Sequence, residues 1–170
     1  EDNDRRRRFD EAALIEAAQR VETELDYPNC SSIMLWSETW HPGVIGIVAS
    51  RLVERFQRPT ILVALDGERG RGSGRSLPGL DLNQLLGRCE DLLEGFGGHA
   101  FAAGLTVRKE RLPELRERVE RIVREQPGLA DAVVVAGHHP EWGEVPVVVT
   151  TARPAIDELR RVVGATLPSE

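Results

Sequence analysis

Two short apolar runs with a helix-like segment between them constrain the fold of this chain more than any other feature. Residues 31–36 (SSIMLW) end in four apolar residues, and residues 59–65 form an apolar run rich in β-branched side chains, so both segments predict strands. Residues 43–56 interleave small residues with Ile, Val and Leu and predict a buried helix. Strands alternating with helices indicate an α/β domain. Because the alternation is not strict along the chain, we expect a mixed β-sheet flanked by helices.

Further helices and two glycine-rich segments complete the main part of the chain. Apolar spacing predicts helices over residues 9–27, 80–93 and 110–126, the second beginning after Asp81. The segment 66–76 is rich in Gly and Arg and predicts a loop. Residues 95–107 predict a glycine-rich loop that runs into a strand.

The texture changes after Pro127-Gly128, where we place a domain boundary. Valine-rich runs predict strands over 131–136 and 145–151, and residues 155–164 predict a helix. This order indicates a small β-β-α C-terminal appendage. The expected parts are a charged lead-in and connector helix (1–30), a main domain (31–126) and the appendage (128–170).

Composition excludes several classes of protein. Hydrophobic residues make up 41% of the chain, enough for a core. The two cysteines, Cys30 and Cys89, cannot form a disulfide framework and fit a reducing cytoplasm. No apolar run reaches membrane-spanning length, so we expect no membrane partner. The charged N-terminus is unlike a signal peptide and lacks an initiator methionine, from which we expect the chain to begin within a longer protein.

Positive charge gathers in one stretch of an otherwise acidic chain. The formal net charge is −6, yet residues 51–75 contain six arginines and only three acidic residues. The planar guanidinium group pairs well with phosphate oxygens. This distribution favours a local grip on a phosphate group over the coating of a long duplex.

The motif GRGSGRS supplies the first candidate site. Its glycines let the backbone approach a ligand, and its Ser and Arg side chains can donate to phosphate. Ser73 and Arg75 are two residues apart, so on an extended chain they point to one face. The alternative is a flexible, solvated hairpin loop. The candidate substrate-binding residues are Gly72, Ser73, Gly74, Arg75 and Ser76.

The motif GFGGHAFAAG supplies the second candidate site. His99 follows Gly97 and Gly98, whose freed amides can face a ligand. The imidazole could donate to a phosphate oxygen or transfer a proton, which makes His99 the candidate catalytic residue. The alternative is a packed histidine that is bonded to the backbone.

Other candidates are weaker. His41 precedes the helix predicted at 43–56, where it either faces an anion or caps the helix. The run Arg5–Arg8 favours a solvated face over a phosphate contact. The chain has four histidines and lacks an Asp-His-His cluster, so we assign no metal ligand.

Four blocks in order resemble one family: WHPGVIGIVASRL (40–52), RPTILVALD (58–66), GSGRS (72–76) and FGGHAFAAGLT (96–106). Over about residues 1–126 the chain resembles the DHH-associated domain of RecJ-type single-stranded-DNA exonucleases and its connector. The resemblance implies a parent enzyme that degrades single-stranded DNA from the 5′ end, with manganese or magnesium bound in a separate DHH domain. It implies that Ser73 and Arg75 hold the 5′ phosphate, and that His99, with Gly97 and Gly98, reaches the scissile phosphate.

The resemblance also sets the expected activity of the chain. The metal-binding DHH domain has no counterpart in it, so we expect that domain to be a partner and this chain to be inactive alone. Other members of the DHH family, the oligoribonucleases and cyclic-dinucleotide phosphodiesterases, share the glycine-histidine block and remain an alternative. A chimeric or fragment protein without activity is another, and a small phosphoesterase complete in itself is a third.

The tail is similar to a different family. The run ADAVVVAGHHPEWGEVPVVVTT and the segment IDELRRVVGATLP resemble the C-terminal domain of adenylate-forming acyl-CoA ligases, especially the succinylbenzoate–CoA ligases, over about residues 130–166. The segment with that family's catalytic lysine has no counterpart, so no ligase activity is implied.

Overall fold

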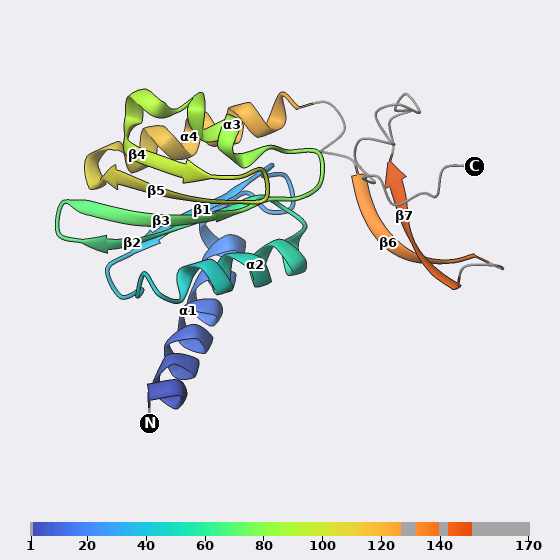
Figure 1. The fold of residues 1–170 in the computed structure, drawn as a ribbon, viewed down its shortest axis with the longest axis horizontal. Helices are drawn as coiled ribbons and strands as arrows, with labels where there is room; N and C mark the ends of the chain where they lie inside the picture. The colour runs from blue at the N-terminus through green and yellow to red at the C-terminus, as the bar shows by residue number, and fades with distance from the viewer. Residues whose placement is uncertain (1, 127–131, 140–142, 151–170) are drawn as a thin grey trace.

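A five-stranded mixed sheet with helices on both faces forms the main domain (Figure 1). The computed structural model describes the backbone of residues 2–126, 132–139 and 143–150, and the side chains of residues 9–126. The strand order is β1-β2-β3-β5-β4; β1 and β2 are parallel, and the other neighbours are antiparallel. This architecture confirms the expected α/β class with a mixed sheet.

The strands are β1 (Ile33–Ser37), β2 (Thr60–Asp66), β3 (Arg69–Arg75), β4 (Leu93–Gly98) and β5 (Ala102–Arg108). The helices are α1 (Asp2–Glu24), α2 (Ile45–Phe56), α3 (Leu82–Gly87) and α4 (Leu112–Arg124), with short 3₁₀ turns η1 (Glu90–Leu92) and η2 (Lys109–Arg111).

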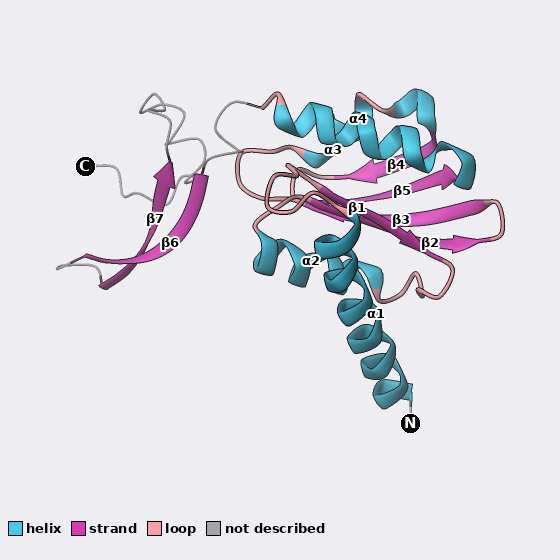
Figure 2. Ribbon diagram, turned by 180° about the vertical axis from the view of Figure 1, so that it is seen from behind, coloured by secondary structure: helices cyan, strands magenta, loops and turns pink. Residues whose placement is uncertain are grey.

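Each face of the sheet carries its own hydrophobic core. Figure 2 shows the helices that cover these faces, α3 and α4 on one side and α1 and α2 on the other. Val63 and Leu105 belong to the core beneath α3 and α4, whereas Leu35 and Leu62 belong to the core beneath α1 and α2. In the core beneath α1 and α2, the sheet residues with described side chains all come from β1 and β2. The half of that face formed by β3, β5 and β4 therefore lies outside the second core.

Strand β3 is the main departure from the predicted elements. The sequence predicts a loop over residues 66–76, but the structure places β3 at the centre of the sheet. The cause is a close fit on the core side, where a Cβ at Gly72 would lie 2.7 Å from Leu105 Cγ and one at Gly74 would lie 2.7 Å from Leu82 Cδ2. Neighbouring side chains fill the space above these glycines, so a strand without side chains on one face packs well there.

Two other predicted elements differ in extent. The helix predicted at 80–93 ends at Gly87, and its capping by Asp81 is confirmed by a 3.0 Å hydrogen bond from the Gln84 amide to the Asp81 carboxylate. A strand, β4, stands where the glycine-rich loop was expected, because this segment pairs with β5 along its length. The helix predicted from residue 9 begins already at Asp2.

In the tail, β6 (Ala132–His139) and β7 (Gly143–Thr150) pair antiparallel and confirm the two predicted strands. The helix predicted at 155–164 lies outside the described residues. Within the described part of the chain, none of the helices combines the length and the apolar character needed to cross a bilayer.

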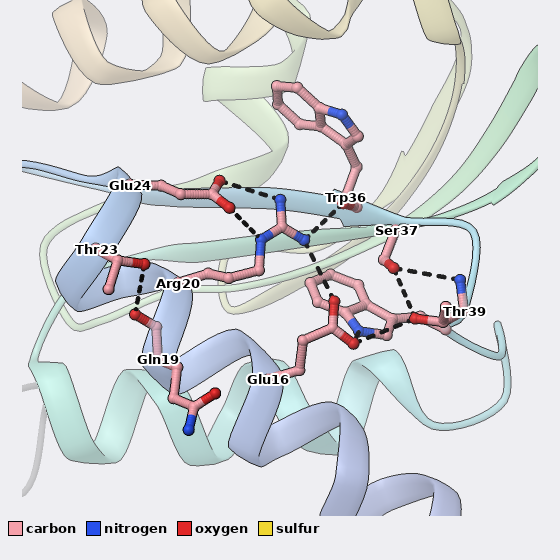
Figure 3. A network of polar contacts seen from close by, with 9 residues as sticks. Glu16, Gln19, Arg20, Thr23, Glu24, Trp36, Ser37 and Thr39 are labelled. Carbon is pink, nitrogen blue, oxygen red and sulfur yellow. Dashed lines mark hydrogen bonds and ion pairs between the residues drawn. The ribbon is translucent and has the colours of Figure 1, made fainter.

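Polar contacts fix α1 to the sheet (Figure 3). Arg20 donates to the Trp36 carbonyl at 2.8 Å, and the Glu16 carboxylate accepts from the Trp40 indole at 3.0 Å. Arg20 also pairs with Glu24 at 2.7 Å. The Trp36 side chain packs against the core beneath α3 and α4, and Trp40 belongs to the core beneath α1 and α2. Both tryptophans are therefore fixed by packing, and the polar contacts with them hold α1 against β1.

Candidate functional site

The odd-numbered residues of β3 face away from the glycine-packed core. Since side chains alternate along a strand, they lie on the face that carries α2. Their partners on β5, and the partners of those on β4, share this face through the observed register. We call this surface the open face; its residues are Arg69, Arg71, Ser73, Arg75, Gly95, Gly97, Ala102, Gly104, Thr106 and Arg108.

Ser73 and Arg75 lie side by side on the open face, as their spacing predicts. Arg75 Nη1 donates to Ser73 Oγ at 3.1 Å and to the Gly74 carbonyl at 2.7 Å. Among the described residues, Arg75 has no carboxylate within ion-pair distance. The guanidinium group is therefore oriented and retains its charge for an anion.

Helix α2 holds this pair from above. A Cβ at Gly46 would lie 2.8 Å from Arg75 Nη2 and 3.1 Å from Ser73 Oγ. Glycine at this position thus lets the first turn of α2 approach the two side chains closely. The sequence motifs did not single out Gly46, because its neighbours on β3 are almost thirty residues away along the chain.

His99 lies in the hairpin between β4 and β5, next to the end of β3. Its amide donates to the Ala102 carbonyl at 2.9 Å, and the Ser76 amide donates to the Phe101 carbonyl at 3.0 Å. The exposed imidazole accepts a long hydrogen bond, 3.4 Å, from the Phe101 amide at Nδ1. A neutral ring then carries its proton on Nε2, where it can donate to a ligand.

The two glycines before His99 have different surroundings. Gly98 has a φ of +147°, and a Cβ there would lie 2.4 Å from the Ala102 carbonyl oxygen, so the hairpin itself requires glycine. Gly97 pairs with Gly104 on the open face, is exposed, and has no atom within 4 Å of a Cβ position. Packing within the described residues therefore does not explain the glycine at position 97.

The remaining candidate residues take part in turns or in core packing. The Ser76 hydroxyl donates to the Leu80 carbonyl at 2.9 Å and so closes a turn. Gly72 and Gly74 face the core. His41 Nδ1 accepts from the Gly43 amide at 3.0 Å, a bond within the turn before α2. These residues shape the fold around Ser73, Arg75 and His99.

Magnesium or manganese ligands do not fit what the structure shows. In the part of the chain described, no group of three or more His, Cys, Asp or Glu side chains is arranged to hold a metal ion. Both cysteines are buried and free, and burial raises the pKa of each thiol.

Comparison with protein families matches two models to this chain. The DHHA1 domain matches residues 29–125, which include the whole five-stranded sheet. The AMP-binding enzyme C-terminal domain matches residues 118–169. Both matches agree with the resemblances found in the sequence.

Curated relatives and solved structures are similar to the first of these parts. The single-stranded-DNA-specific exonuclease RecJ of Bacillus subtilis is 46% identical over 110 residues, 63% of this chain and 14% of that protein. RecJ of Thermus thermophilus is 36% identical over 146 residues, 86% of this chain and 21% of that protein. This chain therefore spans about a fifth or less of the length of these two relatives.

The crystal structure of Thermus thermophilus RecJ in complex with Mg²⁺ superposes with a TM-score of 0.66 and 37% sequence identity, covering 74% of this chain and 19% of that one. A crystal structure of exonuclease RecJ bound to manganese gives the same TM-score and covers 30% of that chain. Since the DHHA1 match covers more than half of the sequence and coincides with the sheet that carries Ser73, Arg75 and His99, the chain belongs to the DHHA1 domain family.

Proposed function

We propose that this chain binds the 5′-phosphorylated end of single-stranded DNA, as the substrate-binding part of a metal-dependent 5′ to 3′ exonuclease. The observation that carries the proposal is the arrangement of Ser73 and Arg75 on the open face, with His99 in the adjacent hairpin. The relatives named single-stranded-DNA-specific exonucleases supply the substrate class.

The chemistry of the pair suits a terminal phosphate. A phosphate monoester carries more charge than the diester linkages of the strand, and an arginine fork can bind two of its oxygens at once. Arg75 already points its guanidinium group along the open face through its bonds to Ser73 and Gly74. The Ser73 hydroxyl can turn its proton toward a third oxygen. The pair therefore favours a phosphorylated end over a hydroxyl end.

His99 has a separate proposed role at the next linkage. Gly97 and Gly104 leave the surface between Ser73 and the hairpin low, so the first nucleotide can lie across it. The Nε2 proton of His99 can then donate to an oxygen of the phosphodiester that follows. Hydrolysis itself requires metal ions, for which the described residues offer no site. We therefore propose that this chain binds without hydrolysing.

The test compares short fluorescent single strands with and without a 5′ phosphate. We expect the wild-type chain to bind the phosphorylated strand about tenfold more tightly, equivalent to about 1.4 kcal/mol. The double variant Ser73→Ala/Arg75→Ala should bind both strands equally. Arg88→Gln, which removes a charge on α3's C-terminal side where Arg88 pairs with Glu125, is the matched control and should keep the preference.

Equal binding of both strands by the wild-type chain would reject the phosphate pocket. Turnover of either strand by the chain with Mn²⁺ would reject the proposal that it only binds. A matching strand of RNA distinguishes the DNA-specific proposal from the alternative in which the DHH-family parent acts on oligoribonucleotides.

A further inference from the structure

The arginines of the open face differ in how much charge they retain. Arg69 pairs with Glu94 at 3.0 Å, and Arg108 pairs with the same carboxylate at 3.6 Å and with Glu110 at 3.6 Å. Arg71 lies between Arg69 and Ser73 on the same face of β3 and is exposed. Among the described residues, Arg71 has no carboxylate within ion-pair distance. Positive charge is thus neutralised at one end of the row and free from Arg71 onward.

The carboxylate that causes this difference lies at a β-bulge in β4. Leu93 pairs with Val107 and Gly95 pairs with Thr106, so Glu94 is an extra residue in β4. Counting from Leu93, which lies on the core side, a regular strand would place Glu94 on the open face and Gly95 on the core side; the bulge instead places Gly95 on the open face as well. From there Glu94 reaches Arg69 and Arg108, and Gly95, which lies beyond Thr106 in the same row as Arg71, leaves that part of the surface low. Strand β4 thus neutralises the arginines at one end of the row on the open face and leaves the surface in line with Arg71 accessible.

We infer that Arg71 binds an internal phosphate of the single strand, and that Glu94, together with Glu110, limits the contact to this one arginine by neutralising Arg69 and Arg108. The inference rests on the proposed function and adds to it a second phosphate position and its boundary. Arg71 and Ser73 are two residues apart on β3, about 7 Å along the strand. That distance is comparable to the step between successive phosphates of an extended single strand.

Salt dependence separates the charges that meet phosphate from those that do not. Each phosphate neutralised by the protein contributes about 0.7 to the slope of log K against log salt for single strands. An arginine already paired with a carboxylate releases no further counterions when the strand binds. Arg71 should therefore appear in the slope, whereas Arg69 should not.

The experiment measures binding of the full 170-residue chain to hexathymidylate by fluorescence anisotropy at several salt concentrations. Strands with and without a 5′ phosphate are used, and 5′-thymidine monophosphate serves as a competitor. Arg71→Gln should weaken hexamer binding about five- to tenfold and lower the slope by about 0.7 for both strands. Its competition constant for the monophosphate should equal that of the wild type. Arg69→Gln, on the same face of the same strand, is the matched control and should change neither quantity.

Glu94→Gln tests the boundary directly. It keeps the shape of the side chain but removes its charge, so Arg69 should become available, whereas Arg108 keeps its pair with Glu110. We expect tighter hexamer binding and a slope that is steeper by about 0.7 or more. The double variant Glu94→Gln/Arg69→Gln should lose part of this gain.

Three outcomes would overturn the inference: an unchanged slope in Arg71→Gln, an equal effect of Arg69→Gln, or a loss of monophosphate competition in Arg71→Gln as large as the loss of hexamer binding. The unphosphorylated hexamer keeps this test separate from that of the terminal pocket, because it has internal phosphates only. A wild-type chain without preference for a 5′ phosphate would reject the proposed pocket while the effect of Arg71 on the unphosphorylated strand could still be measured.

Discussion

At the scale of single residues, Gly46 shows how a small side chain in one element determines the geometry of a site in another. The atoms nearest to its Cβ position belong to Arg75 and Ser73, and the closest is the end of a flexible side chain. A methyl group at position 46 can therefore be accommodated by displacement of the guanidinium group, with little strain on the backbone. Stability and binding should respond to this substitution in opposite directions.

Gly46→Ala should keep or raise the free energy of unfolding, because alanine is favoured over glycine in a helix by about 1 kcal/mol. It should reduce the preference for a 5′-phosphorylated strand several-fold, since Arg75 must move away from Ser73. Urea unfolding and strand titration measure the two quantities. Ser50→Ala, which changes one hydroxyl on the same helix, should leave the preference unaltered. A Gly46→Ala chain with the wild-type preference would show that the contact does not position Arg75.

Glu120 is a second residue with a defined electrostatic role. Its carboxylate accepts from the amides of Ser31 and Ser32 and from the Ser32 hydroxyl, at 2.6 to 2.8 Å, which ties α4 to the start of β1. Burial alone would raise the pKa of Glu120, but these hydrogen bonds and the charge of Arg124 together bring the pKa below its ordinary value. The ionised form is therefore the one that stabilises the fold.

Glu120→Gln should lower the free energy of unfolding at pH 7 by about 1–3 kcal/mol, because a charged acceptor is lost from donors that stay in place. A lowered pKa contributes stability above the ordinary pKa of glutamate, about 4.5, and that contribution disappears as the pH falls through the folded-state pKa. The difference between variant and wild type should therefore shrink below pH 4.5. Denaturant titrations at pH 7 and pH 3.5 test this, and a difference that does not depend on pH would contradict it.

At the scale of elements, glycine occurs in the two glycine-rich motifs for different physical reasons. The glycines of β3 face filled space, whereas Gly97 on β4 faces open space. A single sequence cannot separate these cases, because both motifs are equally rich in glycine. Their distinction depends on which side chains the sheet brings alongside, such as Leu105 and Leu82.

Gly72→Ala should destabilise the chain by about 1–3 kcal/mol, since its Cβ would overlap Leu105 Cγ and Cδ1 at 2.7 and 2.8 Å. Gly97→Ala is the matched control and should leave stability equal or slightly higher, because alanine restricts the unfolded chain more than glycine. Thermal unfolding of both variants gives the comparison. Similar losses in the two variants would mean that the packing difference has no energetic weight.

Local pattern was sufficient for most of the elements and insufficient for the central one. The apolar periodicity of residues 43–56 and 59–65 identifies α2 and β2, and Asp81 identifies the start of α3. The spacing of Ser73 and Arg75 also places them on one face. The strand β3 was missed because its stability comes from neighbours distant in sequence. The role of Glu94 was missed because its partners Arg69 and Arg108 lie on other strands. The contact with Gly46 has the same non-local origin.

At the scale of the whole molecule, both hydrophobic cores and the open face lie within residues 9–126. Among the strands that the structure describes, β6 and β7 pair with each other and form a hairpin separate from the main sheet. The site that we propose thus depends on contacts made within the DHHA1 part of the chain.

A chain shortened to residues 1–126 should therefore fold with the unfolding midpoint of the main domain unchanged within a few degrees, and should bind a 5′-phosphorylated strand like the full chain. Circular dichroism during heating and strand titration measure both properties. Loss of binding in a folded shortened chain would assign part of the interface to the tail.

The alternation along β3 makes the length of this segment as important as its composition. One face of β3 lies against the core and has room for glycine only, at Gly70, Gly72 and Gly74. The open face carries Arg71, Ser73 and Arg75. A substitution at one position disturbs one function, but insertion or deletion of a single residue would exchange the two faces for the rest of the strand. Arginine would then enter the core while glycine turned toward solvent. Insertion or deletion of one codon in this segment, which the sequence suggests is a tolerant loop, would therefore abolish folding and binding together.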